Sequence, residues 1–157
     1  MKSSFTTTDI VKLGIQFGRV REWIVAEYVK PSVPSPGQGK PAEFSLWDLY
    51  MIELFRHLVD MGLSRELASQ FVKFLDKLKI KGREDPVPEQ YVVFTKNGDE
   101  VKSHLIGTAV NVFLKLEVDQ PLSSRKDPAD LLRVGDWETI IIVDFRKIKE
   151  RVNAAIE

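Results

Sequence analysis

Cysteine is absent from the 157-residue chain, and only two histidines, His57 and His104, are present. The absence of cysteine excludes disulfides, thiolate metal ligands and cysteine nucleophiles together. Because the two histidines fall in different halves of the chain, a metal site would need carboxylates for most of its ligands. We therefore expect neither a metal site nor a cofactor.

Long apolar runs are also absent. None approaches the roughly 18 residues of a membrane-spanning helix, and residues 1–8 lack the basic and apolar regions of a signal peptide. We therefore expect a cytoplasmic protein with no membrane partner. Hydrophobic residues make up 43% of the chain and charged residues 29%, a balance that favours a folded globular protein over a disordered one.

An excess of charge of one sign is missing as well, since 23 Lys and Arg residues balance 23 Asp and Glu residues. The chain thus has no global basic field of the kind that many nucleic-acid-binding proteins carry. Residues 1–40 have a local excess, with six basic side chains against three acidic ones. Any contact with DNA must therefore be local.

The sequence FTTTDIVKLGIQFGRVREWI at residues 5–24 has a helical pattern that stops and restarts. Three threonines precede a short first helix over residues 9–13, where they can cap its start. Gly14 supplies a permissive turn, and Ile15 is placed to fill the angle between two helices. The second helix starts at Gln16 and has a buried and an outward face. We predict Phe17, Val20 and Ile24 on the buried face, Gly18, Arg19, Glu22 and Ala26 on the outward face, and Arg21 and Trp23 at the edges.

Proline and glycine interrupt the pattern between residues 30 and 44, which we predict to be a loop with short strands at its ends. Ser45 and Asp48 then have the spacing of a capping box that starts a third helix, which runs to about Met61. Gly62 and Ser64 mark the end of that helix and the start of a fourth. The fourth helix has apolar residues at helical spacing: Leu67, Ala68, Phe71, Val72, Leu75 and Leu78.

The charged segment over residues 79–89 contains a glycine and two prolines and predicts a linker. We place the linker at 81–89, between domains at 1–80 and 90–157. In the second domain, Asn97-Gly98 predicts a hairpin with a type I′ turn. Strands are predicted over residues 110–118 and 137–143 and a short helix over 127–132, before a final amphipathic helix with Phe145, Ile148, Val152 and Ala155 on one face.

Four stretches of the first half, FTTTDIVKLGI, QFGRVREW, FSLWDL and MGLS, carry a family resemblance. In their order and spacing, residues 5 to about 75 resemble the N-terminal domain of the MerR family of bacterial transcription regulators. The resemblance implies a MerR-like winged helix-turn-helix of about four helices with a wing loop, acting as a homodimer on double-stranded DNA. With the small mixed β-sheet and helix unit that follows, the expected fold class is α+β.

The chain departs from the family's pattern at three positions. Gly18 stands where an arginine is usual, Glu22 replaces a tyrosine, and Ala42 occupies the position of the usual wing arginine. Family members that sense metals or oxidants use thiolates, so this chain is expected not to be a thiolate metal sensor.

Six residues are candidates for DNA contact. Gln16 and Arg19 lie at the start and on the outward face of the second helix, where side chains reach base edges in the major groove. Gln pairs with adenine, Arg pairs with guanine, and Glu22 can accept from cytosine N4. The side chains better suited to backbone phosphates are Arg21, Lys30 and Lys40. The alternative is that all six are solvated side chains on a small helical domain.

The main hypothesis is a sequence-specific DNA-binding transcriptional regulator. Its second half would provide dimer contacts or bind a small-molecule or protein effector. The alternative is a winged-helix protein-interaction module without DNA binding, which accounts for the zero net charge and the missing family arginines. A third hypothesis places an enzyme in the C-terminal half. No nucleophile–base pattern, P-loop or Gly-x-Gly-x-x-Gly run occurs, so we expect no enzymatic activity.

Overall fold

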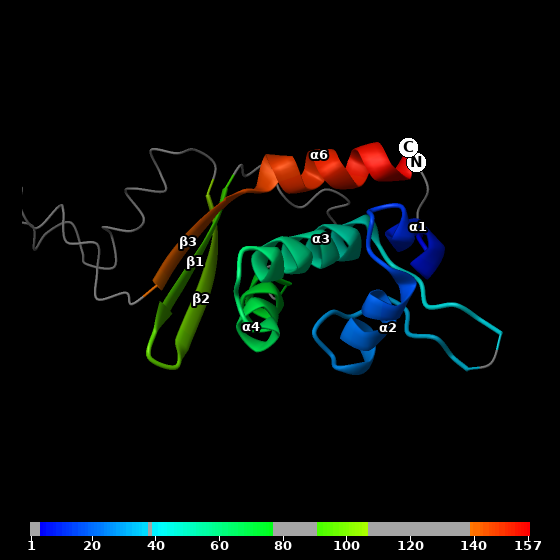
Figure 1. Ribbon diagram of the computed structural model, residues 1–157, viewed down its shortest axis with the longest axis horizontal. Helices are drawn as coiled ribbons and strands as arrows, with labels where there is room; N and C mark the ends of the chain where they lie inside the picture. The colour runs from blue at the N-terminus through cyan, green and yellow to red at the C-terminus, as the bar shows by residue number, and fades with distance from the viewer. Residues whose placement is uncertain (1–3, 38, 77–90, 107–138) are drawn as a thin grey trace, which may run out of the picture. The chain divides into compact units, whose positions relative to one another are not determined.

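The computed structural model describes residues 4–37, 39–76, 91–106 and 139–157. In these residues the chain forms five helices and a three-stranded antiparallel sheet, which confirms the predicted α+β class (Figure 1). The chain divides into two compact units. The first unit combines residues 1–86 with 146–157, and the second unit comprises residues 87–145. None of the helices in the described ranges is both long and apolar enough to cross a membrane.

Helix α1 (Thr7–Val11) begins two residues earlier than the sequence predicted. The reason is the capping residue, since Thr6 is the N-cap and Asp9 occupies the N3 position. The Asp9 carboxylate accepts a hydrogen bond from the Thr6 backbone N–H at 2.8 Å and another from the Thr6 hydroxyl at 3.1 Å. The prediction that a threonine caps this helix is therefore confirmed for Thr6, whereas Thr7 and Thr8 lie inside the helix and not before it.

The break between α1 and helix α2 (Phe17–Val25) includes Gly14 and Ile15 as predicted, although α1 ends at Val11 and not at Leu13. Gly14 has a φ of +79°, a conformation that an L side chain rarely adopts. Ile15, 3% exposed, is buried directly after it. The turn therefore places an apolar side chain in the core and starts α2 in a new direction.

The buried face of α2 differs from the prediction. Val20 and Trp23 are buried, whereas Phe17 is 56% exposed and Ile24 is only half-buried. Relative to the expected face, the buried face is rotated by roughly 60° toward Trp23, at 100° per residue. The larger ring explains the rotation, because Trp23 packs edge-to-face on Phe55 with ring centroids 4.9 Å apart.

The proline-rich loop (residues 30–44) is held at its base. It contains an isolated β-bridge between Val33 and Glu43, and its last residue, Phe44, pairs with Phe5. Short strands were predicted at the loop's ends, and single isolated bridges stand there instead. At the base, Oδ2 of Asp48 accepts hydrogen bonds from the backbone N–H of Ser32 at 2.9 Å and from the Ser32 hydroxyl.

Helices α3 (Leu46–Asp60) and α4 (Arg65–Asp76) form the centre of the first unit. The predicted capping box starts α3, since Asp48 accepts from the Ser45 N–H at 2.8 Å and the Ser45 hydroxyl accepts from the Asp48 N–H at 3.2 Å. Gly62, at φ +99°, follows the end of α3, and the Ser64 hydroxyl caps α4. The fully buried side chains of the two helices include Leu49, Leu54, Phe55, Leu58, Ala68, Phe71 and Leu75.

Helix α6 (Phe145–Ile156) packs on α3, although the predicted boundaries grouped residues 90–157 in one domain (Figure 1). The Tyr50 hydroxyl of α3 donates to Oδ1 of Asn153 at 3.1 Å, and Nε of Arg151 donates to Glu53 at 2.7 Å. The predicted amphipathic face is confirmed by Ile148, which is fully buried. Residues 146–157 therefore belong with the first unit, where α3 supplies hydrogen-bond partners for Asn153 and Arg151.

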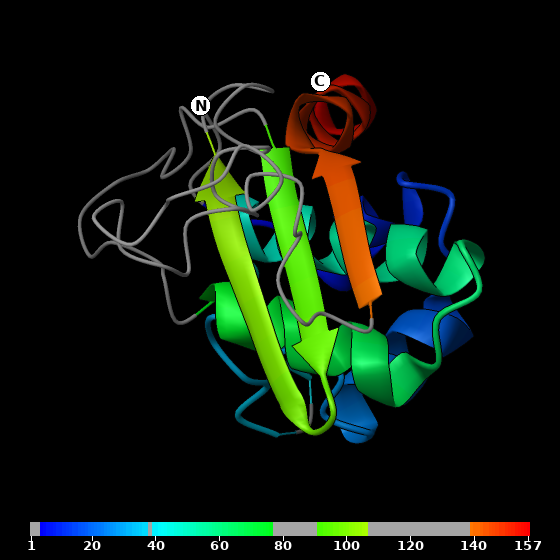
Figure 2. The same ribbon diagram turned by 90° about the vertical axis from the view of Figure 1, so that its left-hand side faces the viewer.

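The sheet of the second unit has the strand order β2-β1-β3, with β1 (Tyr91–Asn97) in the middle between β2 (Glu100–Ile106) and β3 (Thr139–Asp144) (Figure 2). The predicted hairpin is confirmed, but its predicted turn register is wrong. Asn97 pairs with Glu100, so the two turn residues are Gly98 and Asp99. Of Asn97 and Gly98, only Gly98 has a positive φ, +54°, because Asn97 keeps its place in the ladder.

Strand β3 covers residues 139–144 where the sequence predicted 137–143. The predicted strand over residues 110–118 and the predicted helix over 127–132 lie outside the described residues.

Candidate functional site

The outward face of α2 carries most of the residues that the sequence singled out. Gln16 is the N-cap of α2, and Arg19 lies within the first turn; both are exposed. Between them, Gly18 has open space where a Cβ would stand, with nothing within 4 Å. No acidic residue lies in this first turn. The start of α2 is therefore an open surface with hydrogen-bonding side chains and no negative charge of its own.

The remaining predicted residues are also at the surface. Arg21 and Glu22 lie on α2, Lys30 begins the proline-rich loop, and Lys40 lies near the tip of that loop; all four are exposed. The Ser35 hydroxyl donates to the Lys40 carbonyl at 2.7 Å and so closes the tip. The structure thus places Arg19, Arg21 and Glu22 on one short helix with Gln16 at its N-cap, and it places the two lysines on the proline-rich loop.

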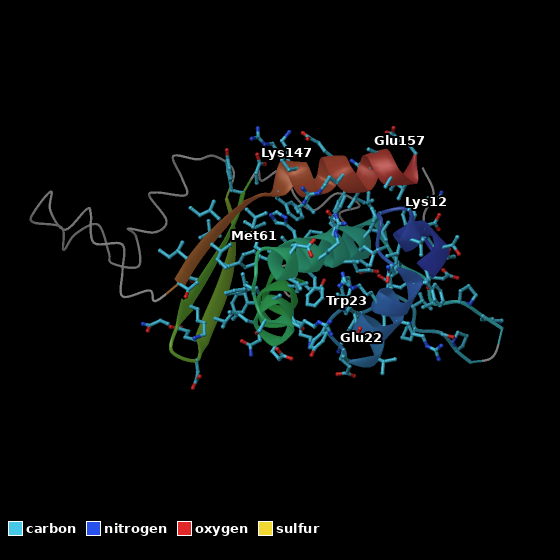
Figure 3. The ribbon with its side chains drawn as sticks, viewed as in Figure 1. Lys12, Glu22, Trp23, Met61, Lys147 and Glu157 are labelled. Atoms are coloured by element: carbon cyan, nitrogen blue, oxygen red, sulfur yellow. The ribbon has the colours of Figure 1, made fainter. Side chains whose placement is uncertain are left out.

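Glu22 has a partner that the sequence reasoning did not foresee. It forms an ion pair with Arg65, the first residue of α4. In Figure 3, Trp23 lies on the side of α2 toward α3, while Glu22 lies farther from α3. Arg65 balances the negative charge of Glu22, which would otherwise repel an approaching phosphate.

A second link connects the end of α2 to the start of α4. The Tyr28 hydroxyl donates to Oε1 of Glu66 at 2.8 Å, and the Tyr28 ring stacks on Phe55 with centroids 5.7 Å apart. The hydrogen bond to the Glu66 carboxylate raises the pKa of Tyr28 above its usual value of 10.0. With the Glu22 pair, this contact fixes the direction of α2 against α4.

A buried charge cluster supports the turn before α2. Oε1 of Glu53, whose side chain is 1% exposed, accepts from Arg56 Nη2 at 2.7 Å and from Arg151 Nε at 2.7 Å. Arg56 also donates through Nη1 to the carbonyl of Leu13 at 3.3 Å. The cluster therefore connects α6 and α3 to the residue that precedes Gly14. This cluster could not be predicted from the sequence, because Glu53 and Arg56 have the i,i+3 spacing of an ordinary solvated pair.

A shallow hollow of about 50 Å³ lies between α3, α4 and the chain that follows α2, lined in part by Asp48, Asp76, Lys30 and Lys73. Small-molecule sites are typically several hundred Å³, so this hollow has room for little more than water. Within the described ranges, no group of three or more His, Asp or Glu side chains could hold a metal ion. Among the described residues, the start of α2 therefore remains the principal candidate.

Comparison with known proteins assigns no family to the chain. No protein-family model matches it, and no curated protein matches it. The function is therefore inferred from the residues of the chain and their geometry.

Proposed function

We propose that the protein is a sequence-specific DNA-binding transcriptional regulator with a MerR-like winged helix-turn-helix. In this proposal α1 and α2 form the helix-turn-helix, α2 is the recognition helix, and the proline-rich loop is the wing. The observation that carries the proposal is the exposed first turn of α2, where Gln16 and Arg19 flank a glycine that leaves the backbone open to close approach.

Each candidate residue has a chemical role in this arrangement. The first turn of a recognition helix meets base edges, so Gln16 suits adenine and Arg19 suits guanine. Arg21 and the two loop lysines, Lys30 and Lys40, suit phosphates, which position the protein without reading sequence. Because the net charge of the chain is zero, these local cations must supply the electrostatic part of the affinity.

Glu22 has two alternatives in this arrangement. In the free protein it is paired with Arg65 and positions α2. To accept a hydrogen bond from cytosine N4 it must exchange that partner. We therefore assign it a positioning role first and a base-reading role only in a complex where Arg65 moves to a phosphate.

The second unit, residues 87–145, is the part to which we assign dimer contacts or the binding of a small-molecule or protein effector. The candidate DNA-contacting residues all belong to the first unit, so none of them lies in the sheet of the second unit. A homodimer would place two copies of α2 on successive major grooves, with half-sites about 34 Å apart.

The test is a titration of the full chain with fluorescent duplex DNA between 50 and 200 mM salt. If the three cations of one subunit that we assign to phosphates contact DNA, log K should fall with log salt with a slope of about −2.7 per subunit, at −0.9 for each phosphate. Lys40→Ala should reduce this slope by about 0.9 and weaken all sequences alike. Arg19→Ala should instead reduce the preference for one sequence by about 1–3 kcal/mol.

The matched control is Lys147→Ala, which removes an exposed cation of α6 that is paired with Glu150. It should leave both the slope and the sequence preference unchanged. Binding that is absent at low salt, or that does not respond to salt, would contradict the proposal.

The protein-interaction module is the second candidate, and a specific observation favours it. Two apolar side chains on α2 are exposed, Phe17 at 56% and Val25 at 76%. Such side chains suit a protein partner as well as a base edge. In that case the same titration would show no salt-dependent DNA affinity.

A further inference from the structure

We infer that Phe17 is a specificity-determining residue that contacts the 5-methyl group of thymine in the major groove, an inference that rests on the proposed function. The sequence predicted Phe17 in the core, yet it is 56% exposed. It is also the first residue of α2. An aromatic side chain therefore stands at the position of the helix that enters the groove deepest.

Packing does not require Phe17. Around the start of α2 the buried side chains are Leu13, Ile15 and Val20, and Trp23 completes the buried face. The exposed ring adds little to the stability of the folded chain. Single exposed apolar residues are common, so the exposure of Phe17 alone indicates no function. Its location at the start of α2 is what indicates a binding role.

The neighbours of Phe17 match the chemistry of a base edge. Gln16 precedes it at the N-cap, and Arg21 follows one helical turn later on the same side of α2, so hydrogen-bonding groups lie next to the apolar ring. In the major groove the thymine methyl is the one apolar feature among donors and acceptors. Gly18 carries no side chain, which lets the helix approach closely enough for an apolar contact. The arrangement fits a thymine that lies beside an adenine paired with Gln16.

The charge pattern favours DNA over an apolar protein surface as the occupant. Phe17 and Val25 are eight residues apart, about 12 Å along the helix, so they form no continuous apolar patch. Arg21 lies between them on the same side of α2, at i+4 from each. A cation in the middle of the stripe suits the negative charge of a phosphate backbone.

The experiment begins with duplexes selected from a random pool by the full chain. Each thymine of the best duplex is then replaced by deoxyuridine, which lacks only the 5-methyl group. At one thymine of each half-site, the wild-type affinity should fall about fourfold, the value of one buried methyl group. Phe17→Ala should bind the thymine duplex correspondingly more weakly and should not distinguish thymine from deoxyuridine at that position.

Two further variants separate this role from a structural one. Phe17→Leu should keep part of the discrimination, because it retains an apolar side chain. Val25→Ala, on the far end of the same helix, should keep the full wild-type discrimination. Because Phe17 is exposed, all three variants should unfold at the same urea concentration as the wild type.

The outcomes distinguish this inference from the proposed function. If the wild type binds DNA with the expected salt dependence but Phe17→Ala discriminates thymine from deoxyuridine as the wild type does, the inference is overturned and the proposed function stands. If no duplex is bound at any salt concentration, both the proposed function and this inference are contradicted.

Discussion

Removing the partners of Glu53 tests most directly how α6 is held to the first unit. The carboxylate of Glu53 is fully buried, and one oxygen, Oε1, accepts from arginines of two helices, Arg56 of α3 and Arg151 of α6. A buried charge that loses its partners cannot recover its hydration. The variants Arg151→Ala, Arg56→Ala and the double substitution therefore measure how α6 is held to the first unit.

The expected magnitudes follow from burial. Arg151→Ala leaves Glu53 paired with Arg56, and the Arg151 side chain is 42% exposed, so we expect a loss of about 1–2 kcal/mol in the free energy of unfolding. The double substitution leaves a carboxylate with no cationic partner and should cost about 3–5 kcal/mol. The double loss should exceed the sum of the single losses, since either arginine partly compensates for the other.

The assay is urea unfolding followed by tryptophan fluorescence, because Trp23 and Trp47 are both buried in the first unit. Lys147→Ala serves as control and should change stability by less than about 0.5 kcal/mol. Adding Glu53→Met to the double variant should restore part of the stability, because it removes the unpaired charge. Were the double variant as stable as the control, Glu53 would not hold α6 in the way described.

Two further predictions concern the first unit. Asp48→Ala removes the acceptor of the Ser32 and Ser45 N–H groups and should lower the free energy of unfolding by about 2–3 kcal/mol. Limited proteolysis should then cut the proline-rich loop faster than in the wild type. An unchanged cleavage rate would refute the role of Asp48 in anchoring the loop. The second prediction concerns His57, whose pKa is lowered below 6.5, first by burial and second by the charge of Arg151. The unfolded chain therefore binds more protons than the folded chain just below pH 6.5, and stability should fall as the pH drops through that value. NMR titration of His57 should show a higher pKa in Arg151→Ala than in the wild type, and equal values would exclude the Arg151 effect.

Local signals predicted the elements well where a single residue type determines the backbone. Ser45 and Asp48 cap α3 as expected, Gly14 forms the turn before α2, and Gly62 ends α3. These predictions held because capping and positive φ depend on a few neighbouring atoms.

Other features depend on contacts that the sequence does not reveal. Trp23, and not Phe17, faces the core because Phe55 of α3 offers a ring to pack on. Residues 146–157 belong to the first unit because Glu53 pairs with Arg151, 98 residues later in the chain. Both facts concern partners distant in sequence, which periodicity cannot identify. The same limit applies to Glu22, whose pairing with Arg65 spans 43 residues.

The most direct test of the central claim is an NMR titration of the isotope-labelled full chain with its selected duplex. We predict that the largest amide shifts fall on residues 16–21 of α2 and on residues 32–43 of the proline-rich loop. These shifts should shrink when salt is raised from 50 to 200 mM. Shifts concentrated in β1 and β2, with α2 unchanged, would contradict the account.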